Sequence, residues 1–115
     1  MDLNTRRFSQ WASEPSDVQG RSVIVQVKVA EGLLTYTGGR SAMVWYGVLA
    51  PCAASQIAGL LKTLSARFNG KTLVWRFLVS DSAEDELAQL LQRFMVRFGS
   101  PPQGMAEHIP AGDPG

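Results

Sequence analysis

The residues that could do chemistry in this chain are few and scattered. Cys52 follows a proline at the predicted start of a helix, where the helix dipole can lower a thiol pKa and make a reactive thiolate. A free cysteine is more often a small buried residue, and the chain has no second cysteine to form a disulfide with it. We therefore interpret Cys52 as a residue that fills the corner between a strand and a helix.

The remaining polar candidates also have simpler explanations. His108 lies in a segment rich in proline and glycine, which does not supply the fixed geometry that a general base needs. Glu84, Asp85 and Glu86 stand in the first turn of a predicted helix, where the dipole favours negative charge. Residues 38–41 (GGRS) lack the lysine and the following helix of a phosphate-binding loop and favour a hairpin turn. The sequence thus predicts no catalytic residue, no metal ligand, no cofactor and no small-molecule substrate.

The densest apolar pattern lies between Lys71 and Phe98. A strand is predicted over 73–79, because its odd positions are all apolar and side chains alternate faces along a strand. Ser82 or Asp81 is expected to cap the helix that follows, and Gly99 is expected to end it. The stripe of this helix recurs every three to four residues and consists of Leu87, Leu90, Leu91, Phe94, Met95 and Phe98.

The rest of the chain is predicted to form one short helix, three strands and one long helix. In chain order they are a short helix from Asn4 or Thr5 to about Ser13, strands at 22–30, 33–37 and 41–50, and a helix from Pro51 to about Phe68. The strand at 41–50 is apolar on both faces, so we expect it to be central in a sheet or covered on both sides.

This order of elements, α-β-β-β-α-β-α, predicts an α+β protein. We expect a two-layer sandwich in which two long helices pack on a four-stranded, mainly antiparallel sheet; the second helix could instead pack on the far face or on another copy. Residues 1–20 would form a short helix and loop, 21–99 the core domain and 100–115 a flexible tail. The chain is 45% hydrophobic and has no apolar run long enough to span a bilayer, so a soluble cytoplasmic protein is expected.

Aromatic and apolar side chains exceed what one small core needs. The residues from which we predict a partner interface are Phe8, Trp11, Met43, Trp45, Tyr46, Phe94 and Phe98. They favour a non-enzymatic protein-interaction module, a small regulator or adaptor that forms a homodimer and binds another protein. Alternatively, Phe8 and Trp11 cover the second face of the sheet within one subunit.

A second hypothesis is nucleic-acid binding. Between Arg21 and Arg76 the chain carries seven basic residues and one acid, Glu31, although its net charge is only +1. Lys28, Tyr36, Arg40 and Arg76 would form a basic, aromatic-bearing sheet face that attracts phosphates and stacks bases of a single strand. A solvated polar sheet face is the simpler explanation of the same residues.

Overall fold

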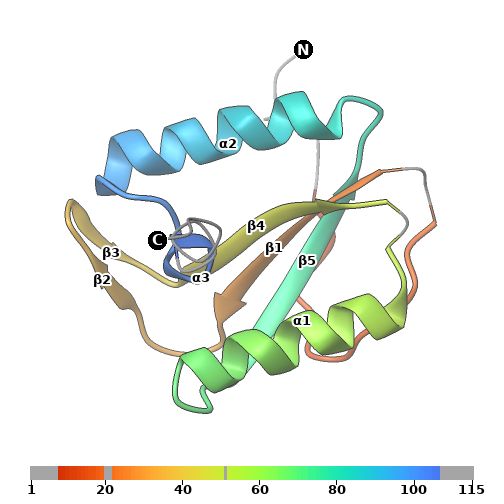
Figure 1. Ribbon diagram of the computed structural model, residues 1–115, viewed down its shortest axis with the longest axis horizontal. Helices are drawn as coiled ribbons and strands as arrows, with labels where there is room; N and C mark the ends of the chain where they lie inside the picture. Colours follow the sequence, from red (N-terminus) through yellow and green to blue (C-terminus); the bar gives the residue numbers. More distant parts are fainter. Residues whose placement is uncertain (1–7, 20–21, 51, 107–115) are drawn as a thin grey trace, which may run out of the picture.

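The protein places a three-stranded antiparallel sheet between two helices (Figure 1). This computed structural model describes residues 8–19, 22–50 and 52–106. The elements are β1 (Val23–Val29), β2 (Leu34–Tyr36), β3 (Gly39–Ser41), β4 (Met43–Leu49), α1 (Ala54–Arg67), β5 (Leu73–Val79), α2 (Ala83–Phe98) and α3 (Gln103–Ala106). The predicted α+β class is confirmed.

The sheet has the strand order β4-β1-β5, and β1 is antiparallel to both neighbours. β4 and β5 therefore run parallel to each other, with α1 as the connection between them, which is a split β-α-β arrangement. The predicted four-stranded sheet is wrong, because β2 pairs only with β3 in a separate two-stranded ribbon. β1 has a long apolar strand on each edge, which leaves no edge for the three-residue β2.

The two long helices lie on opposite faces of the sheet, so the predicted two-layer sandwich is also wrong (Figure 1). The alternating valines of β1, from Val23 to Val29, pack with Ile57 and Leu64 of α1. On the other face, Ile24 packs in a cluster that includes Leu90 of α2. Because Ile24 forms an apolar cluster on this second face with Leu78 of β5 and Val48 of β4, that face needs cover of its own, and the result is three layers.

A bulge in β4 determines which of its apolar side chains lie on each face of the sheet. The register with β1 shifts between Val27 and Lys28. As a result, Val44 and Trp45 both pack on the α1 side, while Met43 and Tyr46 pack on the α2 side. β4 is therefore covered on both faces, as one of the two expectations had it, but β1 is the central strand.

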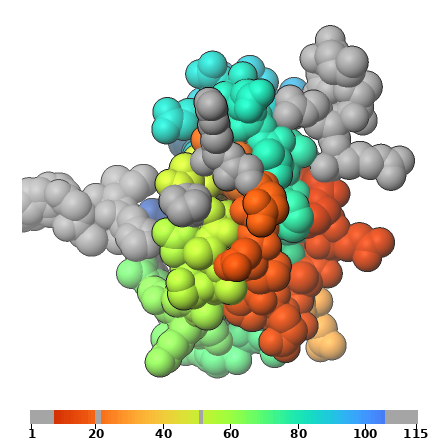
Figure 2. Space-filling model, turned by 90° about the vertical axis from the view of Figure 1, so that its right-hand side faces the viewer, coloured from red at the N-terminus to blue at the C-terminus, as the bar shows by residue number. Residues whose placement is uncertain are grey.

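The N-terminal strap, residues 8–19, replaces the predicted short helix. Its backbone pairs with the outer edge of β5: Ala12 N donates to Trp75 O at 2.8 Å, and Trp75 N donates to Ala12 O at 2.9 Å. Figure 2 shows the strap as a red-to-orange band beside the yellow-green surface of α1. The open edge of β5 needs hydrogen-bond partners, and this non-local demand outweighs the helical spacing of Phe8 and Trp11. The predicted capping residues Asn4 and Thr5 lie outside the described residues.

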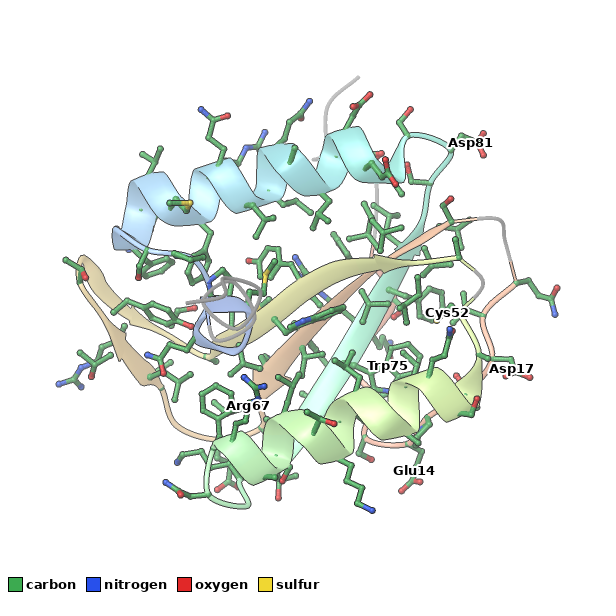
Figure 3. All side chains as sticks on the ribbon, viewed as in Figure 1. Glu14, Asp17, Cys52, Arg67, Trp75 and Asp81 are labelled. Atoms are coloured by element: carbon green, nitrogen blue, oxygen red, sulfur yellow. The ribbon has the colours of Figure 1, made fainter. Side chains whose placement is uncertain are left out.

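The strap also caps α1. Ala53 occupies the cap position of this helix and has no polar side chain to offer, but Asp17 Oδ1 accepts a hydrogen bond from Ala54 N at 2.7 Å. Figure 3 shows Asp17 beside the start of α1 and Trp75 between the sheet and the helix. The indole of Trp75 is buried, and its Nε1 donates to Glu14 O at 3.1 Å. Backbone pairing and side-chain contacts thus join the strap to both β5 and α1.

The C-terminal part follows the prediction more closely. α2 ends at Gly99, whose φ of 80° is the left-handed conformation that glycine adopts readily. The side chain of Ser82 makes no capping hydrogen bond; instead Ser80 Oγ accepts one from Ser82 N at 3.0 Å. Within the predicted flexible tail, Gln103–Ala106 form α3, which packs against β4, and residues 107–115, with His108, lie outside the described residues.

Candidate functional site

The structure gives Cys52 the buried, structural position that the sequence favours. The side chain is 2% exposed and belongs to the core on the α1 side of the sheet. Burial raises the pKa of its thiol, and the nearby negative charge of Asp17 raises it further. Both effects disfavour the thiolate, so this cysteine is not activated as a nucleophile.

The acidic residues at the start of α2 do not converge on one point. Glu84 and Asp85 are exposed, whereas Glu86 is turned inward and accepts a hydrogen bond from Ser80 Oγ at 2.6 Å. Across residues 8–19, 22–50 and 52–106, no group of three or more His, Cys, Asp or Glu side chains is arranged to hold a metal ion.

The residues predicted for the partner interface pack within the subunit. Tyr46 and Phe94 are buried, and their ring centroids lie 5.8 Å apart. Met43 and Phe98 are half-buried against the same cluster, and Trp45 packs on the α1 side. Phe8 and Trp11 cover part of the second sheet face from the strap, as the alternative in the sequence analysis had it, although not from a helix.

An exposed apolar surface lies elsewhere, on the outer side of α2. Met95, which the sequence assigned to the core stripe, is 47% exposed, and Val96 is 81% exposed. Val96 lines a shallow depression together with Gln92, Arg93 and Arg97. Sequence reasoning overlooked Val96, although helical spacing places it opposite Phe94 and off the apolar stripe.

Charge is distributed unevenly along this side of α2. We call its exposed residues the α2 outer face; they are Glu84, Asp85, Ala88, Gln89, Gln92, Arg93, Met95, Val96 and Arg97. Its N-terminal end is acidic, its middle is uncharged, and its C-terminal end is basic and carries the exposed apolar side chains. Negative charge at the N-terminus and positive charge at the C-terminus both interact favourably with the helix dipole, and they give the α2 outer face one acidic and one basic end.

The residues predicted for nucleic-acid binding are only partly brought together. Lys28 of β1 and Arg76 of β5 both lie over the ring of Trp11, at 4.4 and 4.5 Å from its centroid. Tyr36 is buried, and its hydroxyl donates to Met43 O at 2.6 Å, so its ring is not available to a base. Arg40 is exposed but belongs to β3 in the separate ribbon.

A cation–aromatic cluster forms where the strap runs along the edge of β5. It consists of Phe8, Trp11, Gln26, Lys28 and Arg76. The guanidinium of Arg76 lies 4.5 Å from the ring centroids of both Phe8 and Trp11, and its Nε donates to Gln26 Oε1 at 2.6 Å. Within the described segments, no carboxylate forms an ion pair with Lys28 or Arg76. The sequence analysis named all four residues but did not place Phe8 and Trp11 against the two cations, because it did not predict the pairing of the strap with β5.

Comparison with known protein families, curated proteins and solved structures finds no match to this chain. Among the described residues, no helix has both the length and the apolar content needed to cross a membrane. Function must therefore be inferred from two local features, the α2 outer face and the cation–aromatic cluster.

Proposed function

We propose that the protein is a non-enzymatic protein-interaction module, a small regulator or adaptor, that forms a homodimer through the α2 outer face. The observation that carries this proposal is the exposure of Val96, which leaves 81% of the side chain in contact with solvent beside Met95. Exposed apolar side chains that lie next to one another and are flanked by charged residues are typical of protein-binding surfaces.

Charge complementarity favours a second copy of this chain as the occupant. Two α2 helices packed antiparallel place the acidic end of one, with Glu84 and Asp85, beside the basic end of the other, with Arg93 and Arg97. The same contact is made twice, once at each end, which is the rule for a two-fold interface. The uncharged residues between the ends, Ala88, Gln89 and Gln92, would meet in the middle without repulsion.

The dimer should be weak and reversible. α2 has 16 residues, so the contact is about 24 Å long. One pair of helices of that length buries less than the roughly 1,200 Å² at which standard interfaces begin, so we expect a dissociation constant on the order of micromolar. Such an affinity suits a regulator whose subunits exchange or open to receive another protein.

Sedimentation velocity at protein concentrations from about 5 to about 500 µM tests the proposal, since this range spans the affinity expected of a small interface. Val96→Asp should shift the monomer–dimer equilibrium toward monomer, because it places a charge in the apolar part of the contact. Leu33→Asp is the matched control: Leu33 is 60% exposed but lies outside α2, so the equilibrium should not change. A wild-type chain that is monomeric throughout the range contradicts the proposal.

A charge-swap experiment tests the antiparallel arrangement itself. Asp85→Lys replaces a negative charge with a positive one at the acidic end, and Arg93→Glu does the reverse at the basic end, so each variant alone should dimerise less than wild type. Mixing the two should restore dimers, because the contacts of the mixed dimer again join opposite charges. If the mixture is no more dimeric than the separate variants, the two helices do not meet in this way.

A further inference from the structure

We infer that the cation–aromatic cluster is a phosphate-binding site, in which Arg76 and Lys28 hold the anion and Trp11 and Phe8 fix the two cations in place. The site is separate from the α2 outer face and does not depend on the dimer. It revises the predicted basic sheet face, because Tyr36 and Arg40 drop out and two residues of the strap enter.

The position of Arg76 is fixed on three sides before any ligand arrives. Its guanidinium lies against the rings of Phe8 and Trp11, and Gln26, which is only 3% exposed, accepts a hydrogen bond from its Nε. An arginine held in this way loses little freedom when it binds, which favours affinity. Since Nε is committed to Gln26, the donors left for a ligand are the N–H groups of the two terminal Nη nitrogens.

The charges in the cluster call for an anion. Lys28 and Arg76 approach the same indole ring, and no described carboxylate pairs with either of them. Partial burial of Arg76 makes its charge harder to solvate. An anion that contacts both cations would offset that cost. Phosphate provides the charge and the oxygens for a bidentate contact with the guanidinium and a further contact with the ammonium.

The described residues do not cover the cluster completely, so among them a ligand can reach it. α2 packs mainly on β4 and β1, and on β5 it packs with Leu78. Phe8, Trp11, Lys28 and Arg76 all remain half-buried rather than sealed. The phosphate could be free or could belong to a single-stranded nucleic acid, whose backbone offers the same group, and the two sources can be separated by experiment.

Two probes distinguish the sources: inorganic phosphate and a fluorescein-labelled oligothymidylate, each titrated into the full chain at low salt. Phosphate is followed by the shifts of the Trp11 indole and the Gln26 side-chain amide in NMR spectra, against chloride at equal ionic strength. The oligonucleotide is followed by anisotropy. We expect Lys28→Gln to weaken binding about tenfold, as loss of one charged hydrogen bond would. Arg76→Gln should weaken it at least as much.

Arg40→Gln is the matched control, because it removes the same charge from an exposed residue of the separate ribbon and should leave binding unchanged. Lys28→Gln is the more decisive variant, since the Lys28 ammonium lies over the Trp11 ring at the partly exposed surface and the fold should tolerate its loss. If the oligonucleotide binds, Lys28→Gln should also lower the slope of log affinity against log salt by about 0.7, the value for one phosphate contact to a single strand.

Binding of either probe that Lys28→Gln weakens and Arg40→Gln does not supports the site. Phosphate alone identifies a small anion as the ligand, and the oligonucleotide in addition identifies a nucleic acid. The inference is overturned if neither probe binds at low salt, or if Lys28→Gln and Arg40→Gln weaken binding equally, since the effect would then be one of net charge.

Discussion

The hydrogen bond from Ala54 N to Asp17 Oδ1 makes the stability of α1 depend on a residue that lies 37 positions earlier in the chain. The cap position of α1 is an alanine, so Asp17→Ala leaves Ala54 N without its side-chain acceptor, while Gln56 Oε1 still accepts from Ala53 N. Loss of a capping oxygen costs about 1 kcal/mol, and loss of a carboxylate at a helix N-terminus costs about 0.3–1 kcal/mol more. We therefore expect Asp17→Ala to lower the free energy of unfolding by about 1–2 kcal/mol.

Urea unfolding followed by circular dichroism measures this change. With a urea slope of roughly 2 kcal/mol per molar, the midpoint should fall by about 0.5–1 M. Asp17→Asn keeps the capping oxygen and loses only the charge, so its midpoint should lie between those of wild type and Asp17→Ala. Glu14→Ala is the control, because it removes the same charge from the strap, while the hydrogen bond of Glu14 with Trp75 uses the backbone carbonyl.

A second measurement locates the effect. If the cap holds the strap to α1, Asp17→Ala should also speed hydrogen exchange of the Trp75 indole N–H, which donates to the strap at Glu14 O. Equal midpoints for Asp17→Ala and Glu14→Ala would refute the reasoning, because the carboxylate would then contribute nothing beyond its charge.

Burial raises the pKa of Tyr46 from its ordinary value of 10.0 to about 12, and the charge of Arg76 opposes the shift. Because Tyr46 ionises at lower pH in the unfolded chain than in the folded one, the free energy of unfolding should fall as pH rises from about 10 to 12. Urea midpoints measured at several pH values in this range test the expectation. Gly59→Ala should raise stability by about 0.5–1 kcal/mol, because the site is an exposed interior position of α1 with nothing within 4 Å of the added methyl group. Gly47→Ala should instead lower stability by about 1–3 kcal/mol, because the new Cβ would overlap the ring of Trp45. Thermal unfolding should therefore show a higher midpoint for Gly59→Ala and a lower one for Gly47→Ala than for wild type.

Local patterns in the sequence were sufficient to predict most of the elements. The alternation of valines in β1 and the stripe from Leu87 to Phe98 in α2 are set by neighbours two to four residues apart, and both elements form where predicted. Gly99 ends α2 because its left-handed conformation is also a local property. Each of these features requires no knowledge of which segments meet in the fold.

Features that depend on distant partners were not predictable in this way. The strap contains Phe8 and Trp11 at helical spacing, but the unpaired edge of β5 determines its conformation. The same applies to the cap that Asp17 provides and to the convergence of Lys28 and Arg76 on Trp11. Pairing of β1 with β4 rather than β2 likewise depends on how well two apolar strands cover each other. The candidate sites lie mostly in this second group, because surfaces are assembled from distant segments.

Formation of the native sheet must wait for β5. Contacts from the strap to β5 join residues 61 and 68 positions apart, and closing loops of that length slows folding. Until β5 arrives, β1 has one unpaired edge and a row of valines without its full cover, a state that can join to other chains. A chain that is truncated before residue 73, or paused there during synthesis, should therefore be the species most prone to aggregate and most dependent on chaperones.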